Sequence, residues 1–540
     1  MRQWPMAGFI FIITQLIGCG GGETTNTTND VRPPAVAELR FLVSFSQSPL
    51  PADSVTTLVL TPVDGRGQPW PVPVPAPRIS SQCAGQNLAT LGGAPIADGP
   101  QWLQSYSATG CQGSDRLTLF YPDQGQQVQQ QITLPLLPPQ LSKLAQLGKI
   151  LFFSADLAAN AQTCADCHHP AFGYSPAESA PTQPGGMNRA LPGFRRSPAL
   201  GYQAFTPTFS WSALALPLAS SSARGTPIGG QFADGRAADL SAQVAGPLFS
   251  KHEMANADAA QLMQRILQQP IGSAFLQQFP PSTDATVLVQ QVSQAIAAFE
   301  QQDSSFRLFN SKFDAVAQGQ AQFSAAESRG LALFRDPQRG NCTACHSSAA
   351  TQPGQPELFT NHSYVRHAVP RNWQIPYNED AKTDSALAAA GQSGWAYQGD
   401  STEHRFYDLG LCGPMRKTAE FAEHCGAFRV PGLRNVAIRQ AYFHNGVYRQ
   451  LRQVLDFYRW RDTQPARIYR TVANKPDVPY HDSPALWRQP LQHAPFSPQA
   501  NGSDRLSDND IADLIQFLCT LTDGFDPSNP AGYRLPTQCR

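Results

Sequence analysis

The sequence predicts a mainly α-helical fold with two tandem domains, preceded by a small β-sandwich-like domain. Two Cys-X-X-Cys-His motifs, at residues 164–168 and 342–346, lie 178 positions apart in a chain of 540 residues. Apolar residues recur at helical spacing around both motifs, whereas residues 37–135 alternate between apolar and polar positions. The repeated motif and this change of period predict one β domain followed by two helical domains.

Each Cys-X-X-Cys-His motif predicts the covalent attachment of one haem c. Two thiols about one helical turn apart can bond the two vinyl groups of one haem, while the adjacent imidazole reaches the iron. A redox cysteine pair or half of a zinc site is the alternative, but neither needs a following histidine. We therefore expect two tandem c-type cytochrome domains, each with two attachment cysteines and one iron-ligating histidine: Cys164, Cys167 and His168, then Cys342, Cys345 and His346.

The composition excludes some classes of partner. Lys plus Arg equals Asp plus Glu, at 40 residues each, which argues against a nucleic-acid partner. The 47 Pro and 41 Gly residues, with only 15% charged residues, predict long ordered loops rather than a tight helical bundle. The length is sufficient for two to four domains.

Local patterns set the expected domain boundaries. Residues 37–135 form a small β domain of unknown role, in which no catalytic constellation is visible. Helical spacing begins near Leu141, and the first cytochrome domain is expected over 136–312. A capping box, Ser324 to Glu327, predicts a helix ahead of the second motif, within a second domain over 313–540.

The first residues predict export. Residues 1–19 contain an apolar run, Phe9–Ile13, and end in Leu-Ile-Gly-Cys, which resembles a bacterial lipoprotein signal with its lipobox. The run is too short to span a bilayer. We expect the protein on the periplasmic side of the bacterial cell envelope, held to the membrane only by a lipid on Cys19, with residues 20–36 as a flexible tether. An uncleaved short anchor or a plain secretory signal is the alternative.

The cysteine count is compatible with an oxidising compartment. Of 11 Cys, four would bond the haems and one would carry the lipid, which leaves six. Six cysteines allow 15 pairings, and free buried thiols are the alternative for each pair. Proximity in the sequence suggests three disulfides: Cys83 with Cys111, Cys412 with Cys425, and Cys519 with Cys539.

Several short runs resemble the bacterial dihaem cytochrome c peroxidase and MauG family over roughly residues 140–525. Each run is weak alone, but their order around two haem motifs is specific. The resemblance implies that the first haem reacts with peroxide, that the second relays electrons, and that His168 and His346 are the proximal ligands. The runs are Leu-Gly-Lys-Ile-Leu-Phe-Phe at 147–153, Asp-Gly-Arg-Ala at 234–237, Glu-Met at 253–254, Val-Pro-Gly-Leu-Arg-Asn-Val at 430–436 and Tyr-Phe-His-Asn-Gly at 442–446.

The resemblance also implies a distal pocket for the first haem, with Glu253 as the proton-shuttling carboxylate and Gln243 and Pro247 as lining residues. Peroxide must lose a proton from one oxygen and gain one on the other before the O–O bond breaks. A solvated cap carboxylate is the alternative for Glu253. The chain has no His between His169 and His252, so we expect an open sixth position on this iron, with His169 at the surface or behind the ligand and His252 as an ordinary loop residue.

For the second haem, the resemblance points to Tyr458 as the distal iron ligand, where typical peroxidases have Met and MauG has Tyr. None of the six Met residues lies at that position. The alternative is that Tyr458 is a packed helix residue and that the iron has another ligand. We expect His444 to pack near the second haem as a structural residue, and Arg236 and Arg434 to pair with haem propionates or carboxylates, with surface salt bridges as the alternative.

Two family features between the haems are changed here. The tryptophan that commonly precedes Asp-Gly-Arg is Ala233, and nothing in the sequence places Trp211 there instead. The Asn that helps to ligate the family's calcium corresponds to Arg196, and a guanidinium cannot ligate calcium, which needs oxygen donors. An inter-haem calcium is therefore doubtful, and the charge of Arg196 is a conceivable replacement.

Three functions follow from these features. The first is a dihaem peroxidase that reduces hydrogen peroxide with electrons from a small donor protein, a cytochrome c or a cupredoxin. The second is MauG-like, peroxide-dependent oxidation of a side chain on a partner protein, which Tyr458 and the missing distal His favour. The third is a non-enzymatic electron-transfer cytochrome, which an open first haem beside Glu253 disfavours. The lost tryptophan weakens the first two, because electron flow between the haems becomes less certain.

Overall fold

The computed structural model describes residues 38–348, 356–378, 407–413, 415–416, 419–469, 480 and 494–540. Residues 39–540 form one unit. The expected signal (1–19), the expected tether (20–36) and Cys19 lie outside the described residues. Among the residues that are described, no helix is both long enough and apolar enough to cross a membrane.

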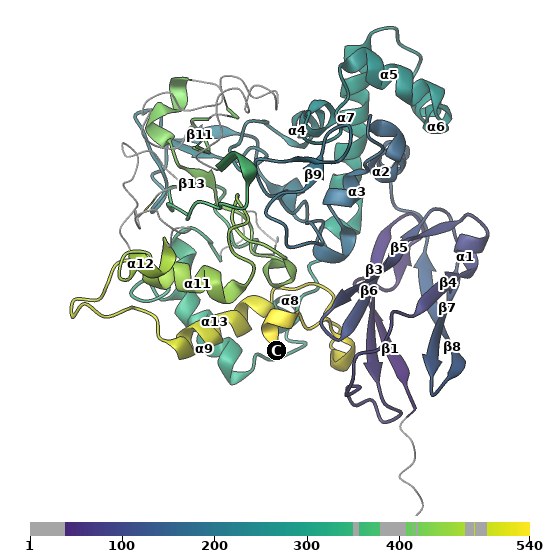
Figure 1. Cartoon of the computed structure of the whole chain (residues 1–540), viewed down its shortest axis with the longest axis horizontal. Coiled ribbons are helices and arrows are strands. Elements are labelled where there is room, and N and C mark those ends of the chain that lie inside the picture. Colours follow the sequence, from purple (N-terminus) through teal and green to yellow (C-terminus); the bar gives the residue numbers. More distant parts are fainter. Residues whose placement is uncertain are drawn as a thin grey trace, which may run out of the picture. The chain divides into compact units, whose positions relative to one another are not determined.

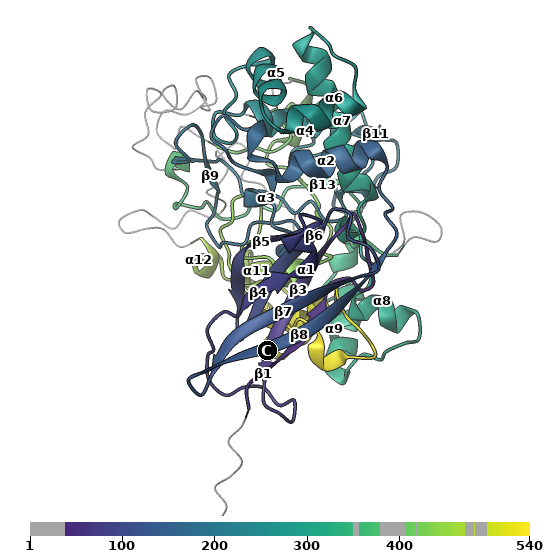
Figure 2. The same ribbon diagram turned by 90° about the vertical axis from the view of Figure 1, so that its right-hand side faces the viewer.

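The β domain consists of two four-stranded sheets, ordered β1-β3-β6-β5 and β2-β8-β7-β4 (Figures 1 and 2). Neighbouring strands are antiparallel, except for the parallel pair of β2 and β8. The strands are β1 (Arg40–Phe45), β2 (Leu50–Pro51), β3 (Val55–Val63), β4 (Arg78–Ser81), β5 (Ala89–Asp98), β6 (Gln101–Ala108), β7 (Ser114–Asp123) and β8 (Gln126–Leu137), with a short helix α1 (Gln82–Gly85) between β4 and β5.

Alternation of buried and exposed residues builds the core between these sheets. In β7, Leu117, Leu119 and Tyr121 are buried, while Thr118 and Phe120 between them are half-buried. Their side chains belong to the same apolar cluster as Leu58 of β3. The buried residues of this strand therefore recur with the period of two that is typical of a strand with one face in the core.

The first helical region runs from α2 to α7. Its longest helices, α2 and α7, cross where Gly148 faces the backbone of α7, since a Cβ on Gly148 would lie 1.8 Å from the carbonyl oxygen of Ala295. Only glycine permits this approach. The elements are α2 (Lys143–Phe153), α3 (Cys164–Cys167), β9 (Pro184–Gly185), β10 (Leu191–Pro192), β11 (Ser210–Ser212), β12 (Thr226–Ile228), α4 (Leu240–Phe249), α5 (Ala259–Gln268), α6 (Ile271–Gln278) and α7 (Ala285–Gln302).

The second helical region repeats that contact. Helix α9 crosses α13 at Gly330, where a Cβ would lie 2.1 Å from the carbonyl oxygen of Asp513. The predicted capping box is confirmed, because Ser324 and Glu327 cap each other's backbone at the start of α9. The elements are α8 (Lys312–Ala317), α9 (Ala325–Arg335), β13 (Tyr364–Val365), β14 (Phe428–Arg429), α11 (Leu451–Trp460), α12 (Pro465–Ile468) and α13 (Asp508–Cys519).

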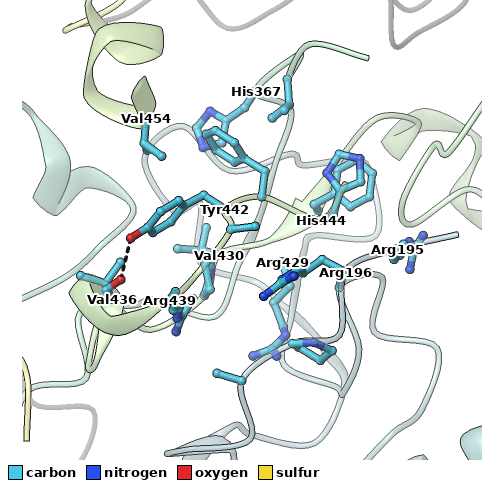
Figure 3. Close-up of a pocket in the computed structure, with 18 of the residues that line it drawn as sticks. Arg195, Arg196, His367, Arg429, Val430, Val436, Arg439, Tyr442, His444 and Val454 are labelled. Atoms are coloured by element: carbon cyan, nitrogen blue, oxygen red, sulfur yellow. Dashed lines mark hydrogen bonds between the residues drawn. The ribbon is translucent and has the colours of Figure 1, made fainter. Parts of the chain in front are cut away.

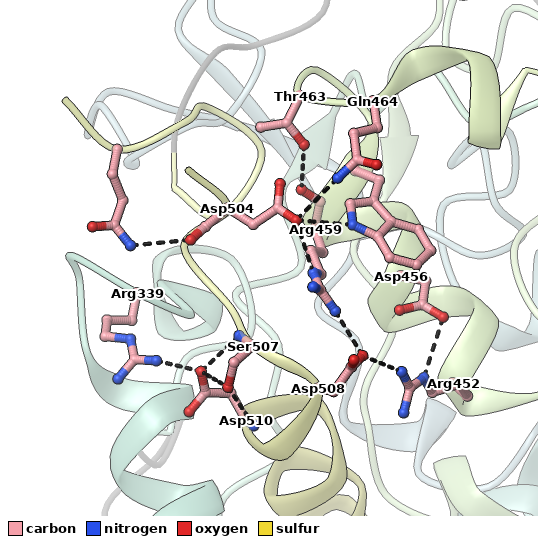
Figure 4. Close-up of polar contacts among 12 residues, drawn as sticks. Arg339, Arg452, Asp456, Arg459, Thr463, Gln464, Asp504, Ser507, Asp508 and Asp510 are labelled. Atoms are coloured by element: carbon pink, nitrogen blue, oxygen red, sulfur yellow. Dashed lines mark hydrogen bonds and ion pairs between the residues drawn. The ribbon is translucent and has the colours of Figure 1, made fainter. Parts of the chain in front are cut away.

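An ion-pair network joins α11 to the start of α13 (Figure 4). Arg459 contacts Asp504 at 3.1 Å and Asp508 at 2.9 Å, and Arg452 contacts Asp508 at 2.5 Å. Because Asp508 is 70% exposed, water and salt screen its two ion pairs, which therefore contribute little to the stability of the fold. The apolar contacts of α9 and α13 are the stronger constraint on this region.

The three expected disulfides are confirmed: Cys83–Cys111, Cys412–Cys425 and Cys519–Cys539. The first lies in the β domain, and the third joins α13 to the C-terminal segment. The free cysteines of the described chain are Cys164, Cys167, Cys342 and Cys345.

Candidate active site

The first motif lies on the short helix α3, which Thr163 and Asp166 begin with a capping box. His168 follows directly, and its Nδ1 is 3.1 Å from the carbonyl oxygen of Tyr174. Because a carbonyl only accepts, Nδ1 must carry the hydrogen, which leaves Nε2 with a lone pair. Burial also lowers the pKa of His168 to about 4. The imidazole is therefore neutral and oriented as a metal ligand requires.

The second motif has the same arrangement. The 3-10 helix η5 (Cys342–Ala344) precedes His346, whose Nδ1 donates to the carbonyl oxygen of Phe359 at 3.0 Å. Burial lowers its pKa to about 4 as well. The thiols of both motifs have pKa values raised to about 12 by burial, whereas redox-active cysteine pairs have lowered thiol pKa values.

A cavity of about 400 Å³ reaches both motif histidines. Figure 3 shows part of the lining of this cavity. The side chains of Gln243, Pro247 and Glu253 line it together with His168. At the second motif its lining includes Cys342, Cys345, His346 and Tyr458. The structure thus brings the expected distal residues of both haems into one continuous space, with Cys164 and Cys167 one turn ahead of His168.

Glu253 lies in the turn after α4, and two distant loops hold that turn. The carbonyl oxygen of Glu253 accepts from Asn160 Nδ2 at 2.8 Å and from the backbone N–H of Gly186 at 2.9 Å. A Cβ on Gly185 would lie 2.1 Å from the carbonyl oxygen of His252, so this contact requires glycine. No pattern in the sequence indicated these supporting residues, because they meet only in the folded chain.

The Glu253 carboxyl is exposed, and the surface that it exposes borders the cavity. Desolvation by the surrounding protein raises its pKa, and a hydrogen bond from Ser250 and the charges of Arg236 and His252 partly oppose this shift. The group therefore keeps a proton to a higher pH than an ordinary glutamate. A carboxyl with a raised pKa is suited to accept a proton and to return it.

His252 and His169 have different surroundings. His252 was expected in an ordinary loop; it does lie in a turn, but it is buried at the cavity, and its Nδ1 is 3.0 Å from the carbonyl oxygen of Pro192. His169 caps the 3-10 helix η2 (Pro170–Phe172), where its Nδ1 accepts from the N–H of Ala171 at 3.2 Å. It follows His168 directly and is not among the described residues that line the cavity.

Two half-buried arginines on the cavity, Arg429 and Arg439, have no carboxylate partner among the described residues (Figure 3). Arg429 donates to the carbonyl oxygen of Phe232 and to the side chains of Thr206 and Gln203. Arg439 donates to one backbone carbonyl, and its Nε has no partner. Burial lowers both guanidinium pKa values. Anionic groups in the cavity would offset the free-energy cost of burying these two positive charges. The propionates of two haems are anionic groups of this kind.

The other two arginines considered above pair with carboxylates. Arg434 is buried and contacts Asp314, with Nη2 to Oδ1 at 2.8 Å, so the surface salt bridge considered as an alternative is wrong for this residue. Arg236 lines the cavity and contacts Asp234 at 3.0 Å. That aspartate also accepts from Arg195 at 2.9 Å.

Ala233, which we expect in place of the family's tryptophan, lines the cavity. Trp211 is not among the described lining residues and stacks instead on Phe421, with ring centroids 5.5 Å apart. His444 lies on the cavity and stacks on Phe428, with centroids 3.7 Å apart.

Arg196 donates hydrogen bonds to backbone carbonyl oxygens. Its guanidinium donates to the carbonyl oxygens of Pro176 at 3.2 Å, of Glu178 at 2.6 Å and of Ala180. Such oxygens are also calcium ligands, so a fixed positive charge occupies this position. The described residues contain no group of three or more His, Cys, Asp or Glu side chains arranged for a metal ion.

Tyr458 lies on α11, and its ring stacks on Phe496 with centroids 5.1 Å apart. His367 contacts it edge to face at 5.7 Å, and it also lines the cavity. Burial raises the pKa of Tyr458, and the nearby thiols of Cys345 and Cys342 add to this rise. The phenol is therefore beside the second motif, where it could approach a haem iron.

Both motifs have an oriented, neutral histidine, and they share one cavity. Half-buried arginines without a carboxylate partner among the described residues also line that cavity. These features define a protein that holds two haems. The family model for di-haem cytochrome c peroxidases matches residues 142–322. The MauG protein of Paracoccus denitrificans is 30% identical over 400 residues, which cover 71% of this chain and 90% of that protein. The chain belongs to the di-haem cytochrome c peroxidase and MauG family, and it is an oxidoreductase.

Two further relatives support this assignment. The cytochrome c551 peroxidase of Pseudomonas aeruginosa is 26% identical over 57% of this chain and 70% of its own length. The crystal structure of the diheme peroxidase BthA from Burkholderia thailandensis superposes with a TM-score of 0.60 at 32% identity, covering 74% of this chain and 91% of BthA. The β domain precedes the matched residues 142–322.

Proposed function

We propose that this protein is a c-type dihaem peroxidase that reduces hydrogen peroxide with electrons from an external donor protein. Residues 136–312 form the peroxide-reacting cytochrome domain and residues 313–540 the electron-transfer domain, after the β domain of 37–135. The observation that carries the proposal is the shared cavity, which reaches His168, His346 and Glu253. Arg429 and Arg439, which have no carboxylate partner among the described residues, are available to pair with haem propionates.

In this proposal Cys164 and Cys167 bond the first haem, and Cys342 and Cys345 the second. The haems supply the redox chemistry, in which one peroxide takes two electrons and two protons and gives two waters. Glu253 accepts a proton from one peroxide oxygen and returns it to the other, which becomes the leaving water. Gln243 and Pro247 shape the space in which the peroxide lies.

The first iron keeps an open sixth position in this proposal, so that peroxide reaches it without prior reduction. The second iron is held by His346 and Tyr458. Support comes from the position of Tyr458, which lies beside Cys342 and Cys345. A phenolate ligand would favour the oxidised state of that haem.

A MauG-like oxidation of a side chain on a partner protein is the second candidate. Tyr458 and the 30% identity to a methylamine utilization protein favour it. The two candidates differ in the source of electrons, which is a small cytochrome c or cupredoxin in the first and a protein substrate in the second. A non-enzymatic electron-transfer role would not require the Glu253 carboxyl in the cavity.

The test is steady-state turnover of peroxide by the purified holoprotein with a reduced small cytochrome c. We expect turnover in the wild type, and a fall of kcat/KM for peroxide by about 10²- to 10⁴-fold in Glu253→Gln, because the proton shuttle is lost. Haem content is measured in both proteins. Lys251→Gln is the matched control, since Lys251 is exposed on the same turn.

Absence of donor oxidation in the wild type would contradict the peroxidase proposal. Peroxide consumption only in the presence of a protein substrate would support the MauG-like function. Equal turnover in Glu253→Gln would remove the role proposed for Glu253.

We also propose that the protein is attached to the membrane on the periplasmic side, through a lipid on Cys19. The sequence pattern of residues 1–19 supports this. Cys19→Ala should then move the protein from the membrane fraction to the soluble fraction of the envelope. Retention of the variant in the membrane fraction would contradict the lipid attachment.

A further inference from the structure

The loop from His168 to Tyr174, here called the proximal loop, lies against the β domain. It carries His168 at one end and, at the other, the carbonyl oxygen of Tyr174 that accepts from His168 Nδ1 at 3.1 Å. In its middle, Ala171 and Phe172 are buried in one apolar cluster with Val59 of β3 and Leu103 of β6. The β domain therefore covers the turn between the proximal ligand and its hydrogen-bond acceptor.

A buried polar chain holds the Tyr174 end of the loop. The Tyr174 hydroxyl lies 2.5 Å from Ser305 Oγ. Ser305 donates its own hydrogen to Asp303 Oδ1 at 2.6 Å, so Tyr174 must be the donor in the first contact. Asp303 Oδ1 also accepts from Ser54 Oγ at 2.7 Å, and Ser54 belongs to the β domain. Ser54, Asp303 and Tyr174 are each at most 1% exposed, so water cannot replace these contacts.

Lys149 of α2 fixes the backbone around Ser54. Its Nζ donates to the carbonyl oxygens of Asp53 at 2.8 Å, of Ser54 at 3.2 Å and of Ala108 at 2.5 Å. Burial lowers the Lys149 pKa to about 8, although the charges of Asp303 and Asp53 oppose the shift. The ammonium group thus joins β-domain carbonyls to the helix ahead of the first haem motif.

Arg534 holds the middle of the loop from the other side. Its Nε donates to Asp98 Oδ2 of β5 at 2.7 Å, and its Nη1 donates to the carbonyl oxygen of Ala171. The guanidinium lies over the Phe172 ring, 5.0 Å from the centroid. Asp98 is 8% exposed and Arg534 6%. A carboxylate of the β domain thereby orients the cation that binds the proximal loop.

We propose that the β domain is a positioning element for the first haem, and that Ser54 and Asp98 act through the proximal loop on the imidazole of His168. The hydrogen bond on the second nitrogen of a ligating imidazole sets its orientation and its basicity. Moving the Tyr174 carbonyl or the turn at Ala171 therefore changes the iron–imidazole bond. The inference rests on the proposed role of His168 as the ligand of the first haem.

The inference gives the β domain a role in the reaction, although it contains no residue of the cavity lining and precedes the residues that match the family model. The competing view is that the β domain only adds stability or binds a partner. In that case, loss of Ser54 or Asp98 contacts would lower the unfolding temperature without any selective effect on one haem.

The test uses full-length holoprotein with Ser54→Ala and, separately, Asp98→Asn. The reduction potentials of both haems are measured by spectroelectrochemical titration, and the iron–histidine stretching band of the ferrous protein by resonance Raman. The potential that moves in Tyr458→Met is assigned to the second haem, because Tyr458 lies beside Cys342 and Cys345. Ser80→Ala and Asp123→Asn are matched controls, since both residues belong to the β domain and the contacts of Asp123 are with Leu39.

We expect both test variants to shift the first potential and the iron–histidine band, to leave the second potential unchanged, and to lower kcat/KM for peroxide by about 10-fold or more. The controls should behave as the wild type. Unchanged haem signals in both test variants, or equal shifts at both haems, would overturn the inference. A selective shift of the first potential in a protein without peroxide turnover would instead uphold the inference and reject the proposed function.

Discussion

The positive charge of Arg236 acts on the Glu253 carboxyl at the first distal pocket. Desolvation raises the pKa of the Glu253 carboxyl, and the positive charge of Arg236 holds part of that rise back. As a base, Glu253 must lose its proton before it can take one from peroxide. Activity should therefore fall at low pH, over a range above the ordinary pKa of glutamate.

Arg236→Gln tests this electrostatic coupling. Removing the cation removes a contribution that lowers the Glu253 pKa, so the pKa should rise, and the acid limb of the pH profile of kcat/KM for peroxide should move to higher pH. Lys251→Gln is the control, because Lys251 is not among the groups that shift Glu253. An acid limb that stays in place or moves to lower pH would contradict the coupling.

A single substitution also tests whether Tyr458 ligates the iron of the second haem. If its phenolate ligates the iron, Tyr458→Phe opens the sixth position and converts a low-spin ferric signal into a high-spin one in electron paramagnetic resonance. Tyr448→Phe is the control, since Tyr448 lies next to the same helix in contact with Phe457 but not on the cavity. An unchanged low-spin signal in Tyr458→Phe would mean that Tyr458 only packs there.

At the scale of elements, the two helical regions are built on the same contact. Gly148 of α2 and Gly330 of α9 each lie ahead of a haem motif, and each faces a carbonyl oxygen of the crossing helix. This repetition supports two tandem cytochrome domains, because the crossing fixes the helix that leads into the motif.

Gly148→Ala should destabilise the first region strongly. A Cβ 1.8 Å from the Ala295 carbonyl oxygen cannot be accommodated without separating α2 from α7, at a cost of about 3 kcal/mol or more in the free energy of unfolding. Thermal unfolding followed by circular dichroism measures the effect. Gly65→Ala is the control, since a Cβ there meets nothing within 4 Å. Equal unfolding temperatures for Gly148→Ala and the wild type would contradict this packing.

Patterns among neighbouring residues predicted several local elements, but they did not predict contacts between segments that are distant in the sequence. The alternation of β7, the capping box at Ser324 and the three disulfides follow from neighbouring residues. The hydrogen bonds from Asn160 and Gly186 to the carbonyl oxygen of Glu253 join segments that are far apart in sequence. No periodicity or motif reports such a contact, so only the folded chain reveals it.

The same distinction applies to the site. Spacing identified both haem-attachment motifs, and the family resemblance indicated Gln243, Pro247, Glu253 and Tyr458, all of which line the cavity. Arg429 and Arg439 could not be identified in this way, because in the sequence they resemble any surface cation. Their lack of a carboxylate partner becomes visible only when the surrounding described residues are in place.

For the whole molecule, the central feature is that two helical regions enclose one cavity with unequal ends. The first end has Glu253 and His252 near His168, and the second has Tyr458 and His367 near His346. A carboxyl suited to proton transfer lies at one end, and a phenol suited to iron ligation at the other. This asymmetry is what the proposed division into a peroxide-reacting haem and an electron-relaying haem requires.

The low-temperature electron paramagnetic resonance spectrum of the as-isolated ferric protein tests that division most directly, because it reports the spin state of each haem without an assumed substrate. We expect one high-spin signal from an open first haem and one low-spin signal from a second haem with two axial ligands. Two low-spin signals would contradict the account, since the first iron would then be closed by another ligand, with His252 the nearest candidate on the cavity.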